Sequence, residues 1–284
     1  MTNFIRSGGV VLLLGLILVS CQKELQFEEG ESEKGLRIIR AVSVTGTDTL
    51  VSEYKYDQRL RLESETSTGK LSGDPYYSFT GFSWDHQDRI TELLHKTWDD
   101  NETIHTTVPY PDASAKEYDY LISTQIYHGA MIQDSTAFVF DNGNMVKNES
   151  FRLSGNQGYL LSRRETFRYN TSGNVDSTDT YSSIGSVNGY VVLISTSCFT
   201  YADHADYLWT TDNAAQNYLL IGIPNRNHKS VKELNIIDRT GLSPTDFNIS
   251  TTLVTDSTGI PQTGTRYMFP QNTTSDLTFY YQQY

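Results

Sequence analysis

The feature that most constrains the fold of this chain is a short aromatic unit that recurs along it. Two aromatic residues, separated by one residue, are followed closely by Asp or Asn, and the copies start at intervals of 28, 56, 29 and 32 residues. Side chains two residues apart project from the same face of a strand, and Asp or Asn can start a turn by bonding nearby main-chain groups. Each unit therefore predicts one β-hairpin. The five copies begin at Tyr54, Phe82, Phe138, Phe167 and Phe199.

Two degenerate copies extend this array. One places Tyr110 inside the doubled interval, and the other ends at Asp256. The turns agree, because Asn142-Gly143 is a strong hairpin signal. A period near 28 residues accommodates two strands of about 10 residues with their connections, so neighbouring strands are expected to be antiparallel. We therefore expect residues 36–284 to form a single repeat-built all-β domain: an antiparallel meander of hairpins forming a large curved sheet or an open barrel.

The units resemble a known repeat. Residues 82–90 are similar to the YD repeat, Tyr-x-Tyr-Asp-x-x-Gly-Arg-Leu, with Asp88 in place of Gly. In the first unit the run from Tyr56 to Leu60 is two residues short in the turn, which predicts a tighter hairpin or a shifted register. Residues 227–232 and 255–261 resemble the end of Bacteroidota lipoproteins of unknown function that carry such repeats. This resemblance implies a large antiparallel sheet on a lipid anchor, and it brings no catalytic residues.

The N-terminus has the layout of a secretory signal. Arg6 precedes an uncharged, mainly apolar run over residues 10–20, and Cys21 follows. The run is shorter than the roughly 20 residues that a helix needs to cross a bilayer, so cleavage is favoured. Residues 18–21, Leu-Val-Ser-Cys, resemble the lipobox of bacterial lipoproteins. We therefore expect a signal peptide over residues 1–20 and an acylated Cys21 that holds the protein on the outer membrane of the cell envelope.

Residues 21–35 are charged, punctuated by Gly and poor in apolar side chains. Such a composition predicts an acidic flexible tether. Its acidic residues resemble the surface-export signal of Bacteroidota lipoproteins, which favours display on the cell surface. The whole chain carries a net charge of -12, and an acidic surface repels a polyphosphate backbone, so we expect no nucleic-acid partner.

One segment departs from the hairpin pattern. Apolar residues from Tyr207 to Leu219 recur at helical spacing, which predicts one short helix over the sheet; a long hairpin connection is the alternative. Elsewhere the six His are dispersed, and neither a zinc-binding spacing nor a nucleophile motif is present. We therefore expect no catalytic residues, no metal and no cofactor, and thus no enzyme.

Four functions follow from these features. The first is a non-catalytic lipoprotein whose sheet is a binding or scaffolding surface for a protein or glycan partner. The second is a lipoprotein that binds or hydrolyses glycans, since exposed aromatic rings stack on sugars. The third is a carrier that encloses a hydrophobic ligand beneath the helix. The fourth is a transmembrane β-barrel. Lys55 and Arg168 alternate with the aromatic residues. This pattern is typical of a sheet with one face in water, so it argues against the transmembrane barrel.

Four Asp-Ser or Asp-Thr pairs resemble an O-glycosylation sequon used on exported proteins of Bacteroidota. Asp beside Ser or Thr is also ordinary turn chemistry. A modified hydroxyl has to lie at a hairpin tip or on a wet face, because sugars are bulky and solvated. The hydroxyls that would carry sugars are those of Thr49, Ser135, Ser177 and Ser257.

Overall fold

The computed structural model describes residues 36–97, 102–127, 130–153, 158–183, 191–205, 214–221, 223–225, 229–240, 247–257 and 260–284. Residues 37–284 form one compact unit. The signal peptide expected over residues 1–20, Cys21 and the tether expected over residues 21–35 lie outside the described residues.

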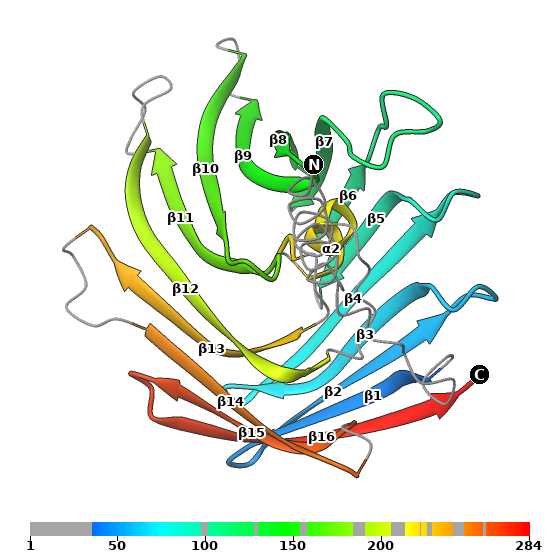
Figure 1. Ribbon diagram of the computed structural model, residues 1–284, viewed down its shortest axis with the longest axis vertical. Helices are drawn as coiled ribbons and strands as arrows, with labels where there is room; N and C mark the ends of the chain where they lie inside the picture. The colour runs from blue at the N-terminus through cyan, green and yellow to red at the C-terminus, as the bar shows by residue number, and fades with distance from the viewer. Residues whose placement is uncertain are drawn as a thin grey trace, which may run out of the picture. The chain divides into compact units, whose positions relative to one another are not determined.

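The described chain forms a closed barrel in which every strand lies beside its neighbour in sequence and the last strand lies beside the first (Figure 1). The strands are β1 (Leu36–Thr45), β2 (Asp48–Tyr56), β3 (Leu62–Leu71), β4 (Asp74–Trp84), β5 (Ile90–Thr97), β6 (Glu102–Thr107), β7 (Tyr120–Tyr127), β8 (Ala130–Asp141), β9 (Asn144–Leu153), β10 (Tyr159–Tyr169), β11 (Val175–Ser183), β12 (Val191–Ala205), β13 (Lys229–Asp238), β14 (Phe247–Thr255), β15 (Pro261–Phe269) and β16 (Thr273–Gln283).

The expected antiparallel all-β meander is confirmed, and the sheet is more specific than the curved sheet or open barrel that we expected, because it closes. Two contacts join the first and last strands. The hydroxyls of Thr45 and Ser275 lie 2.6 Å apart, and the guanidinium of Arg40 lies 5.5 Å from the ring centre of Tyr280. Closure removes the free edges that an open sheet would expose to pairing with other chains.

The barrel has two ends that differ in sequence. The aromatic units lead into one end, which we call the repeat end; it carries the connections β2–β3, β4–β5, β6–β7, β8–β9, β10–β11, β12–β13 and β14–β15. The opposite end, which we call the far rim, carries the connections β1–β2, β3–β4, β5–β6, β7–β8, β9–β10, β11–β12, β13–β14 and β15–β16.

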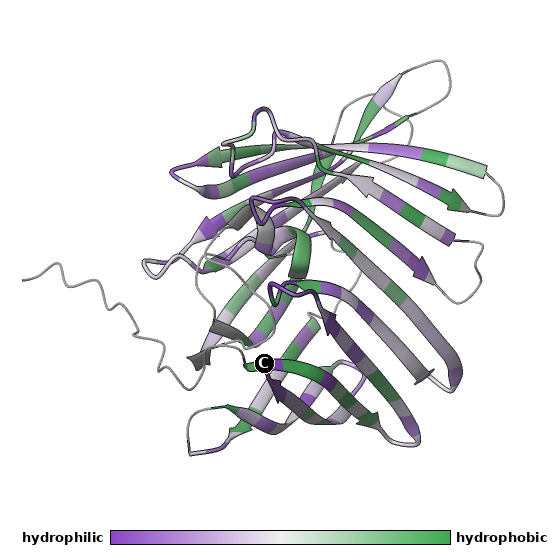
Figure 2. Cartoon of the chain, turned by 90° about the vertical axis from the view of Figure 1, so that its right-hand side faces the viewer, coloured by the Kyte–Doolittle hydropathy of each residue, from purple (hydrophilic) through white to green (hydrophobic). Residues whose placement is uncertain are grey.

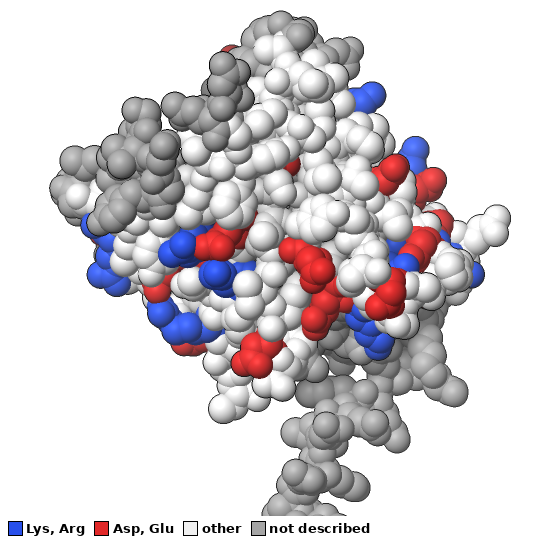
Figure 3. Space-filling view, turned by 90° about the horizontal axis from the view of Figure 1, so that it is seen from above, with Lys and Arg blue, Asp and Glu red and all other residues white. Residues whose placement is uncertain are grey.

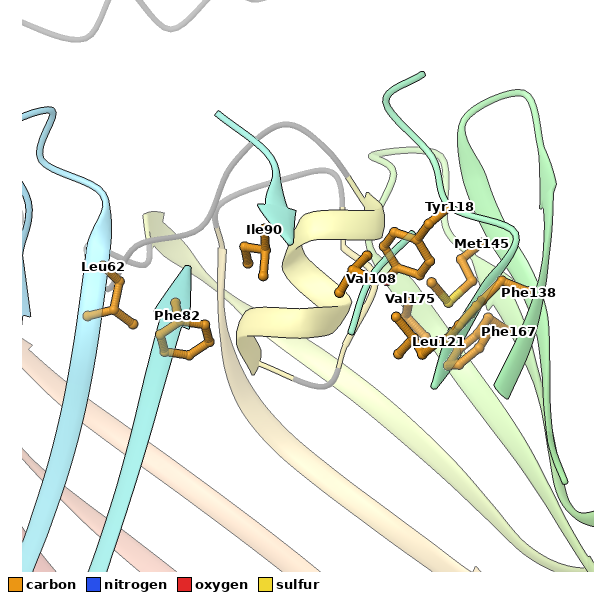
Figure 4. Close-up of a cluster of buried hydrophobic side chains, with 10 residues drawn as sticks. All are labelled: Leu62, Phe82, Ile90, Val108, Tyr118, Leu121, Phe138, Met145, Phe167 and Val175. Carbon is orange, nitrogen blue, oxygen red and sulfur yellow. The ribbon is translucent and has the colours of Figure 1, made fainter. Parts of the chain in front are cut away.

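The aromatic units fill the barrel at its repeat end. Their rings face inward, and the polar residues that alternate with them face outward. The largest cluster of buried side chains draws on β3 to β11 and their connections (Figure 4): Leu62, Phe82, Ile90, Val108, Tyr118, Leu121, Phe138, Met145, Phe167 and Val175. Because strands alternate their side chains between two faces, apolar and polar residues alternate along the strands (Figure 2).

The first two aromatic units share one turn geometry at the repeat end. The main-chain N–H of Asp57 bonds the carbonyl of Arg61, and Asp85 bonds Arg89 in the same way. Our expectation of a tighter first turn is therefore wrong. Leu60 occupies the Gly position of the repeat at φ 60°, as Asp88 does in the second turn, so the first hairpin keeps the full turn length with Leu in a strained conformation.

The hairpin expected at Asn142-Gly143 is confirmed, since both residues have positive φ, 51° and 76°, as a type I′ turn requires. The described helix, α2 (Ala214–Ile221), lies in the β12–β13 connection. It overlaps the expected helical segment, of which residues 207–213 lie outside the described residues. Among the described helices none is long and apolar enough to cross a membrane.

Candidate functional site

The Asp residues of the repeat turns bind Arg residues that link one hairpin to the next. Arg89 donates to Asp85 over 2.8 Å and to the carbonyls of Asp112, Ala113 and Ala115 in the next connection. Arg61 likewise bonds Asp57 and the carbonyl of Asp85. Burial by itself would raise the pKa values of Asp57 and Asp85. These hydrogen bonds outweigh that effect and hold both pKa values below their ordinary range. The Asp and Arg side chains of these two turns therefore serve the structure, because they bond to one another and to the next connection.

The Tyr or Trp at the second aromatic position of most units anchors its hairpin to the preceding one. Its polar tip donates to a main-chain carbonyl at the start of an earlier strand, or near the start in β1, and each accepting residue is almost fully buried. Five bonds of this kind run around the repeat end: Tyr56 to Ile38, Trp84 to Leu62, Tyr110 to Ile90, Tyr169 to Met145 and Tyr201 to Val175.

Helix α2 lies inside the ring of strands, against the aromatic core. The ring of Tyr218 packs edge-on against Phe138 and Phe167, with centroids 5.5 Å and 6.2 Å away. Its hydroxyl accepts a hydrogen bond of 2.9 Å from Asn148, and burial raises the pKa of Tyr218. The helix and the aromatic rings together occupy the interior at the repeat end.

A pocket of about 210 Å³ lies inside the barrel beside this helix. About half of its wall is polar. Four Ser or Thr hydroxyls line it, and so does an ion pair in which Arg163 lies 2.6 Å from Glu165. Ligand pockets usually measure roughly 300–1,000 Å³, so this one suits only a small molecule. Its walls are Arg163, Glu165, Phe167, Thr178, Thr180, Ser195, Ser197, Phe199, Ile223 and Ile236.

A larger depression, of about 440 Å³, lies on strands β2 to β6. It forms around Gly81, where the missing side chain lets the ring of Phe79 fold over the backbone; a Cβ at Gly81 would lie 3.1 Å from that ring. Charged groups surround the aromatic ring, and among them the imidazole of His105 lies 3.8 Å from Glu92. The depression is lined by Lys55, Glu63, Ser64, Phe79, Gly81, Phe82, Ser83, Glu92, Leu94 and His105.

The outer wall of β9 to β12 carries a lattice of ion pairs. Glu149 accepts from both Arg164 (2.7 Å) and Lys147 (3.2 Å), and Asp179 accepts from Arg168 (2.9 Å). Burial opposes ionisation of both carboxyls, but the hydrogen bonds have the larger effect and lower the pKa values of Glu149 and Asp179. Figure 3 shows Lys, Arg, Asp and Glu side chains gathered in a band across one wall, with an area above the band that carries few charges.

The hydroxyls expected to carry sugars differ in exposure. Thr49 is exposed on β2, and Ser257 is exposed at the β14–β15 turn. Ser135 is half-buried within β8. Ser177 is only 6% exposed and accepts a hydrogen bond from Arg168, so it lacks the exposure that modification needs. Glycosylation itself stays a prediction. Within the described residues, no group of three or more His, Cys, Asp or Glu could hold a metal ion.

No model of a protein family matches the chain, and no curated protein matches its sequence. The fold is similar to that of two solved structures. A porin-like protein from Bacteroides vulgatus ATCC 8482 gives a TM-score of 0.54 at 11% identity, covering 87% of this chain and 98% of that one. A porin-like protein from Bacteroides uniformis ATCC 8492 gives 0.49 at 9% identity, covering 86% and 98%. At these identities the likeness is one of fold alone.

Proposed function

We propose that this chain is a non-catalytic, lipid-anchored protein of the cell envelope whose barrel does not cross the membrane and serves as a binding module. The ion-pair lattice on the outer wall carries this proposal. In a transmembrane barrel the outward face meets lipid, where an Arg or Lys costs roughly 2–4 kcal/mol at the bilayer midplane. Lys147, Arg164 and Arg168 lie on that face in pairs with carboxylates, which favours an aqueous wall.

The interior supports a module rather than a channel. A porin has a polar, water-filled lumen, whereas here the aromatic core and α2 occupy the barrel at its repeat end. The name porin-like belongs to the structural neighbours. A carrier of hydrophobic ligands is also poorly supported, because the pocket beside α2 is small and half polar.

The anchor would be Cys21, and residues 22–35 would be the tether. Acylation of this cysteine would give stable attachment, since two or more acyl chains hold a protein on a bilayer where one does not. Two measurements test the proposal. A Cys21→Ala variant, made in the native host, is expected to leave the detergent phase in Triton X-114 partitioning.

The second measurement uses residues 22–284, which contain all of the described strands. This chain is expected to be soluble without detergent and to give no conductance in planar bilayers. A requirement for detergent, or ion conductance, would replace the proposal with a transmembrane barrel.

Glycan binding is a second candidate function, favoured by the depression around Gly81. An aromatic ring beside carboxylate, imidazole and ammonium groups offers both stacking and hydrogen bonding to a sugar. Affinity electrophoresis of residues 22–284 in gels containing polysaccharides tests it. The Phe79→Ala variant is expected to lose retardation, whereas Phe151→Ala, which removes a half-buried ring from the wall of β9, is expected to keep it. Equal retardation of both variants would exclude the depression as the site.

A further inference from the structure

The far rim carries exposed apolar side chains at its hairpin ends. Of the thirteen exposed large hydrophobic residues in the described part of the chain, eight lie within three residues of a far-rim connection. Monomeric soluble proteins rarely expose contiguous apolar patches, and those that do usually bind something there. We therefore expect the exposed apolar side chains of the far rim to bind a partner.

The first group lies on β7 to β10. Ile126 pairs directly with Met131, which is 75% exposed, across the β7–β8 hairpin. Leu153 pairs with Tyr159 across the next one. Two residues further from the rim, Phe151 pairs with Leu161. Paired side chains of this kind share one face of the sheet, so each pair projects outward from the wall.

The second group lies on β15 and β1, which flank β16. Tyr267 and Phe269 end β15, and Val44 lies near the end of β1. In the closed order of sixteen strands, β16 lies eight strands away from β8 in either direction. The two groups are thus on opposite sides of the same end of the barrel. Leu71, on the β3–β4 hairpin between them, is also exposed.

This placement favours a flat partner. A compact protein would have to bridge the whole barrel mouth to cover both groups, whereas a bilayer surface meets all points of a rim at once. Apolar and Tyr side chains suit the boundary between acyl chains and headgroups. Lys70 and Asp74, on the β3–β4 hairpin, are exposed and would lie among headgroups.

The length of the tether allows this contact on the membrane that holds the anchor. Fourteen residues separate Cys21 from Leu36, and they span up to about 50 Å when extended. The twelve-residue strand β8 covers roughly 40 Å along its own axis, and less along the barrel axis because barrel strands tilt. The far rim can therefore reach the anchoring leaflet even though β1 starts at the other end.

We propose that the two groups of exposed side chains at the far rim form a lipid-contacting surface that inserts into one leaflet, while the charged part of the wall stays in water. The contact is apolar, so it does not need anionic lipid. It also does not depend on the acylation of Cys21, because the rim itself binds the bilayer.

Vesicle co-sedimentation of residues 22–284, which lack the acyl group, tests the proposal. The chain is expected to pellet with neutral phosphatidylcholine vesicles, equally in about 0.1 and 1 M NaCl, because salt screens only charge. Two double variants, Ile126→Ser with Met131→Ser and Val44→Ser with Phe269→Ser, are each expected to weaken binding at least about tenfold. The control is Val139→Ser with Val254→Ser, which removes similarly exposed side chains at the repeat end and is expected to bind as the parent does.

Failure of the parent chain to bind, or equal losses in the rim and control variants, would overturn the proposal. So would light scattering that showed a dimer dissociated by the rim substitutions, since the rim would then join two barrels. Circular dichroism melting curves that match the parent's confirm that the variants fold. Because no acyl group is present, none of these outcomes bears on the anchor at Cys21.

Discussion

The indole of Trp84 donates its N–H to the main-chain carbonyl of Leu62 over 2.7 Å. Leu62 opens the returning strand of the preceding hairpin and is 2% exposed, so water cannot replace the bond. Four tyrosines make the same connection elsewhere around the repeat end. The aromatic repeat therefore supplies more than apolar surface, because its ring tips also satisfy buried carbonyls of the neighbouring repeat.

Trp84→Phe is expected to destabilise the barrel by about 1–3 kcal/mol, since it leaves the buried carbonyl of Leu62 without a donor. Urea unfolding followed by fluorescence or circular dichroism measures this loss. Tyr120→Phe removes a hydroxyl from a ring that is 44% exposed and serves as the control, with an expected change within about 0.5 kcal/mol. A Trp84→Phe variant as stable as the parent would contradict the role of this bond.

Arg89→Lys is expected to cost about 1.5–3 kcal/mol although the charge is kept. A lysine cannot bond Asp85 through two nitrogens and also reach the carbonyls of the next connection. Arg59→Lys is the matched control, because its ion pair with Asp88 is more than half exposed on both sides and exposed pairs contribute little. Similar urea midpoints for the two variants would show that the link between hairpins is not energetically important.

Acid is expected to destabilise the fold. The folded-state pKa values of Asp57, Asp85, Glu149 and Asp179 are lowered, so their contribution is fully present above the unfolded carboxyl pKa of about 4 and is lost as pH falls through the lower folded values. Urea midpoints at about pH 7, 4 and 3 should fall below pH 4. Asp85→Asn should flatten the profile, and the exposed Asp276→Asn should not.

The pKa of Glu65 shifts in the opposite direction. Burial raises its pKa, against the hydrogen bonds from Ser67 and Ser52, so its favourable contribution is present below the unfolded carboxyl pKa and is lost as pH rises through the raised folded value. Glu65→Gln is therefore expected to increase the free energy of unfolding at neutral pH and to have little effect in acid. A Gln variant less stable than the parent at pH 7 would show that the ionised carboxylate is needed inside the barrel.

Gly69→Ala is expected to be far more harmful than Gly73→Ala, although both glycines have positive φ. A Cβ at Gly69 would lie 2.0 Å from the carbonyl oxygen of Thr49, whereas a Cβ at Gly73 meets nothing within 4 Å. Gly73→Ala should cost about 1–2 kcal/mol, the price of a left-handed L-residue. Gly69→Ala should in addition break the pairing of β2 with β3, and comparable melting temperatures would contradict this close approach.

Several features of the fold follow from the sequence alone, because they depend on neighbours along the chain. The spacing of two aromatics two residues apart placed Phe82 and Trp84 on one face, and Asn142-Gly143 specified its own turn. Repeats near 28 residues predicted pairs of antiparallel strands. Each of these signals is a local conformational preference repeated many times.

The first repeat turn was predicted wrongly because Leu60 replaces the Gly of the repeat in the same left-handed conformation. Leu60 stands at the Gly position of the first turn, and this substitution concealed that the hairpin has the usual length. The bonds from ring tips to distant carbonyls were also missed, although a signal existed: Tyr or Trp fills the second aromatic position in most units, and both carry a donor that a buried ring must satisfy.

Closure of the barrel, the position of α2 and the two-part outer wall were decided by tertiary structure. Thr45 and Ser275 are 230 residues apart in the chain, and their contact depends on the number, tilt and register of all the strands between them. The same alternation of side chains would also build an open sheet, or a barrel with the aromatic faces outward. Only the joint burial of all the aromatic units, with α2 enclosed among them, selects one closed arrangement, because that burial is a property of the whole barrel and of no single hairpin.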